Sequence, residues 1–269
     1  MPLIFFCRIL PVINSCKMKI LFPQNIFTSL IADCLPLQIK DNIRFLPSAI
    51  LTSQLINSKE SVGLIPALDI INHSELFISK DFGLSFEGSL CNSYLYFSNS
   101  NRRINEIGLY GDVSSVEVIL SKILFHELYD MEIDVKILTD ESKIKDQNLL
   151  IAGDNNFLGQ KYEHGISFAE EFIDTLSLPF VNYVFASMEK SSLGFINEQL
   201  KGKSAVIYSN VDEDRFGENL DSELKNYIKD NISSLVIDFD NQDIEGLNQT
   251  LRLPYFYGMI KDIVEVNYA

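Results

Sequence analysis

The sequence predicts an α/β fold of two lobes, in which a smaller lobe is inserted into a larger one. Short apolar runs of strand length alternate with segments of helical periodicity, a pattern typical of α/β proteins. Two β-rich segments, Ser93–Ser98 and Val181–Ser187, bracket a complete α/β unit in the middle of the chain. We therefore expect the chain to cross between the lobes twice, near these two segments, as two crossover strands.

This organisation divides the chain into three parts. Residues 18–95 and 188–269 form the larger, discontinuous lobe, and residues 96–187 form the inserted lobe. Residues 1–17 are predicted to be an extension that adds nothing to the core. Their apolar stretch is short, is interrupted by Arg8, and follows no Lys or Arg, so it differs from a signal peptide.

The individual elements follow from the same periodicities. In the first part, strands are predicted at 19–22, 44–47, 62–65, 76–78 and 83–85, with helices at 26–34, 48–57 and 67–72. In the middle, strands are predicted at 93–98, 106–110, 134–138 and 149–152, with helices at 115–128 and 168–176. After the strand at 181–187, helices are predicted at 191–199, 220–232 and 244–258.

The helix predicted at 115–128 has a defined start. Ser114, followed three residues later by Glu117, has the spacing of a capping box, which ties down free N–H groups at a helix N-terminus. Gly111 and Asp112 complete a strand–turn–helix unit before it. Such a turn either only caps its helix or presents backbone donors to a carboxylate or phosphate.

Composition excludes some classes of partner. The formal net charge is −15, with 37 acidic against 22 basic residues, whereas a nucleic-acid-binding surface needs clustered Lys and Arg. No stretch has the length of a membrane span. An acidic protein that binds an anion must hold it by local donors such as helix N-termini.

No cofactor or metal is predicted. The chain has no GxGxxG, GxxxxGK[ST], GxSxG or HExxH motif, and its four cysteines and three histidines are scattered. Cysteines without CxxC spacing suggest a reducing compartment, so we expect a cytoplasmic protein.

Asp154 lies directly after the predicted strand at 149–152, in the sequence Gly-Asp-Asn-Asn. Ligands of open α/β sheets gather at the carboxyl ends of strands, which makes Asp154 a candidate ligand-binding residue. The same four residues also have strong turn chemistry, and the sequence leaves both interpretations open.

Five fragments resemble the chorismate dehydratases of the futalosine route to menaquinone, in the same order along the chain. They are Val62–Asp69, which resembles the "ALIPS" turn, Gly83–Ser89 ("GISSDGPV"), Leu150–Asp154 ("LLIGD"), Leu178–Val181 ("LPFV") and Asp243–Leu247, which resembles the closing helix. The resemblance covers roughly residues 19 to 260 and implies a type II periplasmic-binding-protein-like fold.

The resemblance also implies a function and a site. A member of this family would hold a small anionic ligand between its lobes and eliminate water from a cyclohexadiene carboxylate, as a carbon–oxygen lyase without a cofactor. The ligand-binding residues would be Asn25, Ser85, Ser89, Ser114, Ser115 and Asp154. No general base is identified. The alternative is a non-catalytic solute-binding or sensor protein of the same fold, because the "SSRTSV" helix start of the family is only partly kept at Ser114–Glu117.

Overall fold

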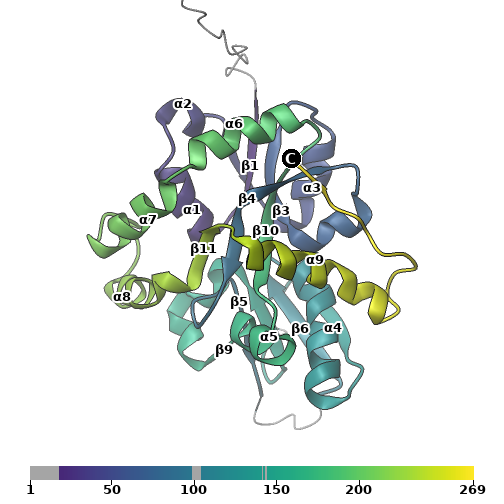
Figure 1. The fold of residues 1–269 in the computed structure, drawn as a ribbon. Coiled ribbons are helices and arrows are strands. Elements are labelled where there is room, and N and C mark those ends of the chain that lie inside the picture. The colour runs from purple at the N-terminus through teal and green to yellow at the C-terminus, as the bar shows by residue number, and fades with distance from the viewer. Residues whose placement is uncertain (1–17, 99–103, 141, 143) are drawn as a thin grey trace, which may run out of the picture.

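A computed structural model describes residues 18–98, 104–140, 142 and 144–269. The extension predicted at 1–17 lies outside these residues. The described strands form two sheets, one in each lobe, and Figure 1 shows the larger lobe above the smaller one.

The larger sheet has the strand order β11-β4-β10-β3-β1-β2, with β12 paired to β4. β1 pairs in parallel with β2 and β3, whereas β10 runs antiparallel to both β3 and β4. Its strands are β1 (Ile20–Pro23), β2 (Ile43–Leu46), β3 (Val62–Pro66), β4 (Phe77–Phe86), β10 (Phe180–Ser187), β11 (Leu235–Asp238) and β12 (Asn267–Tyr268). β1, β3 and β10 are buried at every position, as expected of strands covered on both faces.

Helices cover this sheet. The first part of the chain gives α1 (Ile26–Asp33), α2 (Leu37–Lys40), α3 (Ser48–Ile56) and the 3₁₀ segment η1 (Ala67–Asn72). The last part gives α6 (Lys190–Leu200), α7 (Lys203–Asp212), α8 (Ser222–Asn231), η5 (Ile232–Ser234) and α9 (Asn241–Phe256).

The smaller sheet has the order β7-β6-β8-β5-β9. Its strands are β5 (Ser93–Tyr96), β6 (Glu106–Gly111), β7 (Asp134–Leu138), β8 (Leu149–Ala152) and β9 (Ile166–Ser167). The helical segments of this lobe are α4 (Ser115–Tyr129), η3 (Gly153–Asn156), η4 (Leu158–His164) and α5 (Phe168–Leu176). The predicted fold class, an α/β protein of two lobes, is confirmed.

The chain passes from the larger to the smaller sheet between β4 and β5, and returns between α5 and β10. The boundaries therefore differ from those predicted. β10, which we assigned to the inserted lobe, is a central strand of the larger sheet, and β5 lies wholly in the smaller one. A strand that is buried at every position, as β10 is, shows no alternation of exposed and buried residues that would reveal which sheet it joins.

Other elements also differ from the prediction. The segments 76–78 and 83–85 belong to one strand, β4, because a register shift between Ile78 and Gly83 takes polar residues out of the ladder without ending the strand. The helix α7 and the strand β11 were not predicted at all. α7 has a weak apolar face, with only Ile207 and Val211 buried.

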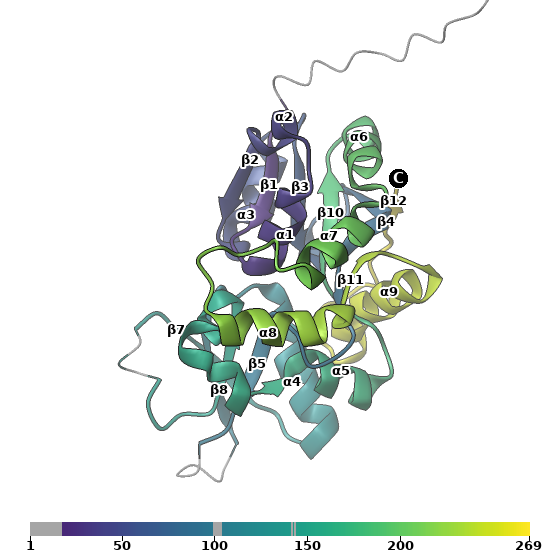
Figure 2. The ribbon, with the colours of Figure 1, turned by 90° about the vertical axis from the view of Figure 1, so that its left-hand side faces the viewer.

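The lobes share one apolar core and are closed against each other. Phe27 of α1 packs edge-on against Phe86 and also against Phe157 of the smaller lobe, with ring centroids 4.9 and 6.0 Å apart. Figure 2 shows α8, which follows β10 in the chain, lying across the boundary between the lobes. Its Tyr227 stacks on Tyr162 of the smaller lobe at 4.2 Å.

Candidate functional site

Between the lobes, carboxylates of the smaller lobe cap two helices of the larger lobe. Asn25 is the N-cap of α1, where its side chain accepts from the Thr28 N–H at 3.0 Å. The next N–H, that of Ile26, donates to Asp154 Oδ1 at 2.8 Å, although the two residues are 128 positions apart. A helix N-terminus carries free N–H groups and a partial positive charge, so it favours an anion.

The second contact lies at α3. The first residue of this helix, Ser48, donates to Asp112 twice, from its N–H to Oδ1 at 2.8 Å and from its hydroxyl to Oδ2 at 2.6 Å. The Ser48 hydroxyl also lies 2.8 Å from the phenolic oxygen of Tyr183 on β10. Asn92 completes the cluster by donating from Nδ2 to the same phenolic oxygen at 3.4 Å.

Glycines bring the two carboxylates to one place. Gly111 (φ +92°) precedes Asp112, and Gly153 (φ +77°) precedes Asp154, and both have left-handed backbone angles that favour glycine. A Cβ at Gly111 would lie 2.1 Å from the Ala152 carbonyl oxygen, and one at Gly153 would lie 2.9 Å from Cβ of Asp112. The two turns of the smaller lobe therefore pack directly on each other at the carboxyl ends of β6 and β8.

Burial dominates the electrostatics of this site. It raises the pKa of Asp112 above its usual value, against the lowering effect of the hydrogen bonds from Ser48. It also raises the pKa of Asp154, and the nearby charge of Asp112 adds to that rise. No described Lys or Arg contributes to the pKa shift of either carboxyl group. The helix ends therefore hold carboxylates that are costly to ionise.

The turn before α4 has the capping box predicted for it. Ser114 caps the helix, and Glu117 Oε2 accepts from the Ser114 N–H and hydroxyl at 2.9 and 2.6 Å. Glu117 is fully buried, and its Oε1 accepts from the Ser93 hydroxyl at 2.8 Å. The carboxylate is thus turned back onto its own helix and occupied, while the Ser115 hydroxyl is buried without a partner.

The predicted site residues separate into two groups. Asn25 and Asp154 meet at the end of α1, and Ser114 and Ser115 start the helix that follows Asp112. The Asp154 carboxylate accepts the backbone N–H of Ile26, and the Asp112 carboxylate lies near enough to raise its pKa. The Gly-Asp-Asn-Asn sequence forms a 3₁₀ turn, and the ligand-binding interpretation of Asp154 stays a prediction.

Ser85 and Ser89 lie elsewhere. Ser85 is buried within β4 and donates to the Phe180 carbonyl at 3.1 Å, in the ladder between β4 and β10. Ser89 donates to Glu170 Oε1 at 2.9 Å, beside Tyr227 of α8. The predicted convergence of all these residues on one gap is therefore wrong for Ser85 and Ser89. Ser85 lies within β4, and Ser89 lies in the segment that joins β4 to β5.

Two cavities border these groups. One of about 410 Å³ adjoins the end of α1 and is lined by Ile26, Ser29, Asp154 and Phe157 on one side and the 217–221 loop on the other. A larger one of about 610 Å³ contains Ser89, the stacked Tyr162 and Tyr227, and the carboxylates of Glu163, Glu170, Glu223 and Asp230. Of these two cavities, the first lies beside the N-terminus of α1, where Ile26 and Asp154 line it.

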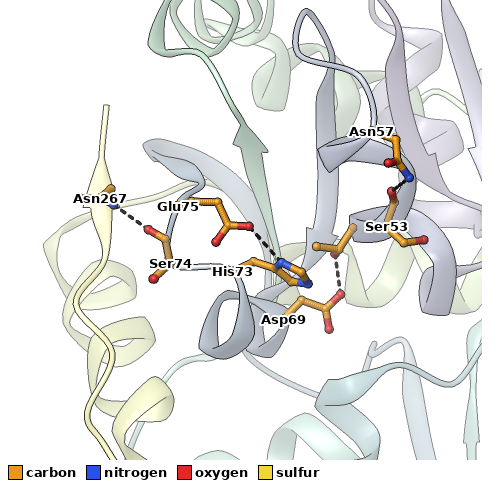
Figure 3. A network of polar contacts seen from close by, with 8 residues as sticks. Ser53, Asn57, Asp69, His73, Ser74, Glu75 and Asn267 are labelled. Atoms are coloured by element: carbon orange, nitrogen blue, oxygen red, sulfur yellow. Dashed lines mark hydrogen bonds and ion pairs between the residues drawn. The ribbon is translucent and has the colours of Figure 1, made fainter.

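A separate polar network lies at the edge of the larger lobe (Figure 3). His73 pairs with Glu75 at 3.2 Å, and Asn267 near the C-terminus donates to the Ser74 carbonyl at 2.6 Å. Asp69 accepts from the Thr52 hydroxyl at 2.5 Å. These contacts fasten β12 and η1 to the lobe and explain the position of His73 without a ligand.

Within the part of the chain that the structure describes, no three His, Cys, Asp or Glu side chains are placed to share a metal ion. No described helix is long and apolar enough to cross a membrane. Three residues of the cluster at α3 were not predicted from the sequence: Ser48, Asn92 and Tyr183. Ser48 carries a detectable signal, since it begins a predicted helix directly after a predicted strand.

Comparison with known proteins identifies the fold. No family model matches the chain, and no curated protein matches it. Among solved structures, the alkanesulfonate-binding protein SsuA from Xanthomonas axonopodis pv. citri, bound to MOPS, superposes with a TM-score of 0.64 at 10% identity, over 94% of this chain and 98% of its own. The chain has a type II periplasmic-binding-protein fold.

Two further structures have the same fold without revealing an activity. Protein AF1704 from Archaeoglobus fulgidus superposes with a TM-score of 0.67 at 10% identity, over 90% of this chain and 98% of its own. The Candida albicans CA3427 gene product, described as having the generic periplasmic-binding-protein fold, gives 0.58 at 12% identity, over 91% of both chains.

Proposed function

We propose that this protein binds a small carboxylate between its two lobes. The observation that carries the proposal is the seating of two carboxylates, Asp112 and Asp154, on the N-termini of α3 and α1. Both helices have at least eight residues, and each presents a backbone N–H at 2.8 Å from a carboxylate oxygen. A ligand carboxylate that enters when the lobes separate meets the same donors.

The surrounding groups favour a ligand that also carries hydroxyl groups. The Ser48 hydroxyl and the Tyr183 phenol lie at the α3 end, and the Asn25 Nδ2 lies at the α1 end. These neutral donors and acceptors orient a polar ligand without a formal positive charge. The 410 Å³ cavity beside Ile26 is of the size that small-molecule sites occupy.

The finer proposal is membership of the chorismate dehydratase family of menaquinone biosynthesis, with a cytoplasmic location. Its support is the ordered set of five resembling fragments together with the fold. Elimination of water requires a base for a C–H proton and an acid for the departing hydroxyl. Asp112 and Asp154, whose pKa values are raised by burial, are the carboxyl groups beside the site with the character of such a base.

The second candidate is a non-catalytic small-ligand-binding protein of the same fold. The observation that favours it is the state of Glu117. Its two carboxylate oxygens accept three hydrogen bonds from Ser93 and Ser114. The carboxylate in the first turn of α4 is therefore already bonded within the protein. Detection of a product separates the two candidates, since both bind the ligand and only the lyase consumes it.

The test is a thermal-shift screen of small carboxylates, chorismate included, followed by chromatography of the bound mixture. A ligand that binds only the folded state raises the unfolding midpoint according to RT ln(1 + [L]/Kd). The decisive variant is Ile26→Pro, which removes the N–H that donates to Asp154. It and its control are made in an Asp154→Ala background, so that the substitution changes a donor for the ligand and no contact with Asp154. Proline is tolerated at the first position of a helix because that N–H has no partner within the helix.

Ile26→Val is the matched control, because it keeps the N–H and a β-branched apolar side chain. We expect Ile26→Pro to weaken carboxylate binding about tenfold or more, the effect of losing one charge-assisted hydrogen bond, and Ile26→Val to bind normally. Equal binding by both variants, or no shift with any carboxylate, contradicts the proposal.

A further inference from the structure

The contacts that indicate a carboxylate site also fill it. Asp112 and Asp154 come from adjacent turns of the smaller lobe, and each occupies the N-terminus of a helix of the larger lobe. The bonds span 64 and 128 residues of sequence, so they join the lobes and do not belong to either lobe's own secondary structure. They therefore depend on lobe closure.

We propose that Asp112 and Asp154 form an intramolecular latch, which holds the ligand-free lobes closed by occupying the anion-binding ends of α3 and α1. The inference rests on the proposed function only in taking this interlobe region as the place where a ligand enters. Entry of a carboxylate then requires that both side chains leave the helix ends. The latch thus sets a threshold for binding.

Unpaired groups at the same two ends show that the closed contact leaves hydrogen-bonding capacity unused. Asn25, which precedes Ile26, is 2% exposed, and its Nδ2 has no partner. Asn92 is fully buried beside Tyr183 and Ser48, and its Oδ1 has no partner either. An unpaired buried polar atom is costly, so groups of this kind need an explanation. A ligand that replaces the latch would supply one donor and one acceptor for them.

The negative charges of the two latch carboxylates are also not balanced by a nearby Lys or Arg among the described residues. Asp112 raises the pKa of Asp154 by charge repulsion, and burial raises both. A permanent interlobe contact would pair each buried carboxylate with a cation, because an unpaired buried charge is expensive. Two hydrogen-bonded carboxylates without such partners form a contact that a modest ligand affinity can displace.

The connections between the lobes allow such opening. The two chain passages leave from β4 and return to β10, which are neighbours in the larger sheet. Two adjacent passages of this kind permit a hinge rotation without breaking either sheet.

The test measures lobe closure in the absence of any ligand, by small-angle X-ray scattering of the full chain in a Tris chloride buffer free of carboxylates and sulfonates. The double variant Asp112→Ala/Asp154→Ala removes both acceptors, and the double variant Asp112→Asn/Asp154→Asn keeps an acceptor oxygen at each helix end. We expect the alanine pair to have a larger radius of gyration than the wild type, and the asparagine pair to match the wild type.

A second variant opens the lobes by changing a residue of the larger lobe as well. Ile26→Pro combined with Asp112→Ala breaks one contact from each side and should open the lobes as the double alanine variant does. Circular dichroism establishes that each variant is folded. Scattering that is identical for the wild type and every folded variant overturns the latch. This result is independent of the proposed function, which fails separately if no carboxylate binds to any variant.

Discussion

Asp112 Oδ2 accepts a 2.6 Å hydrogen bond from the hydroxyl of Ser48, and the same hydroxyl lies 2.8 Å from the phenol of Tyr183. A turn of the smaller lobe, a helix of the larger lobe and the central strand β10 therefore meet through one serine side chain. Because Ser48 and Tyr183 are fully buried, each bond replaces water that the site excludes. This small polar cluster joins the two lobes across their boundary.

Removal of the Tyr183 hydroxyl tests how much this cluster stabilises the fold. Tyr183→Phe keeps the ring and deletes the oxygen that contacts both Ser48 and Asn92. We expect the free energy of unfolding in urea to fall by about 1–2 kcal/mol, the cost of leaving buried polar groups with fewer partners. Tyr255→Phe is the control, because that ring is 39% exposed. An unchanged urea midpoint for Tyr183→Phe would show that its bonds contribute nothing to stability.

The turn that carries Asp112 depends on Gly111. A side chain there would be forced into φ +92° and would bring Cβ to 2.1 Å from the Ala152 carbonyl oxygen. We expect Gly111→Ala to destabilise the protein by about 2 kcal/mol or more, since neither backbone segment can move away cheaply. In contrast, Gly194 lies within α6 with no atom near its added Cβ, so Gly194→Ala should stabilise the helix by about 0.5–1 kcal/mol. Thermal unfolding of both variants makes the comparison, and similar effects of the two substitutions would refute it.

The fold was predictable from the sequence because local signals agree with the tertiary arrangement. The strands at 134–138 and 149–152 and the helix at 168–176 have the predicted bounds, and Ser114 with Glu117 forms the predicted capping box. Local patterns could not show to which sheet a strand buried along its whole length, such as β10, belongs. That choice is made by long-range pairing with β3 and β4.

The site was predictable only in part, for a similar reason. Asn25 follows the carboxyl end of β1 in the larger sheet, Asp154 follows that of β8 in the smaller sheet, and ligands of open α/β sheets gather outside such strand ends. Tyr183 lies within a buried strand, where an aromatic residue is usually part of the core. Ser85 was expected in the site through the resemblance of its fragment, but its hydroxyl is consumed by the Phe180 carbonyl. The spacing of residues along the sequence does not show which side chains point across the boundary between the lobes.

The raised pKa values of Asp112 and Asp154 determine whether these groups stabilise the protein more at low or at high pH. A carboxyl group whose pKa is higher in the folded than in the unfolded protein adds stability below its unfolded pKa, near 3.9, and that stability is lost as the pH rises through the folded value. The wild type should therefore lose stability relative to Asp112→Asn/Asp154→Asn as the pH rises from about 4 through the raised values. Urea unfolding at several pH values measures this difference. Asp140 provides a control of opposite sign, because hydrogen bonds from Ser142 lower its pKa, so its contribution is lost as the pH falls. The opposite result would be a wild type that gains stability over the double asparagine variant as the pH rises. It would show that the helix N-termini lower the pKa values of Asp112 and Asp154 by more than burial raises them, which contradicts a latch that a ligand displaces easily.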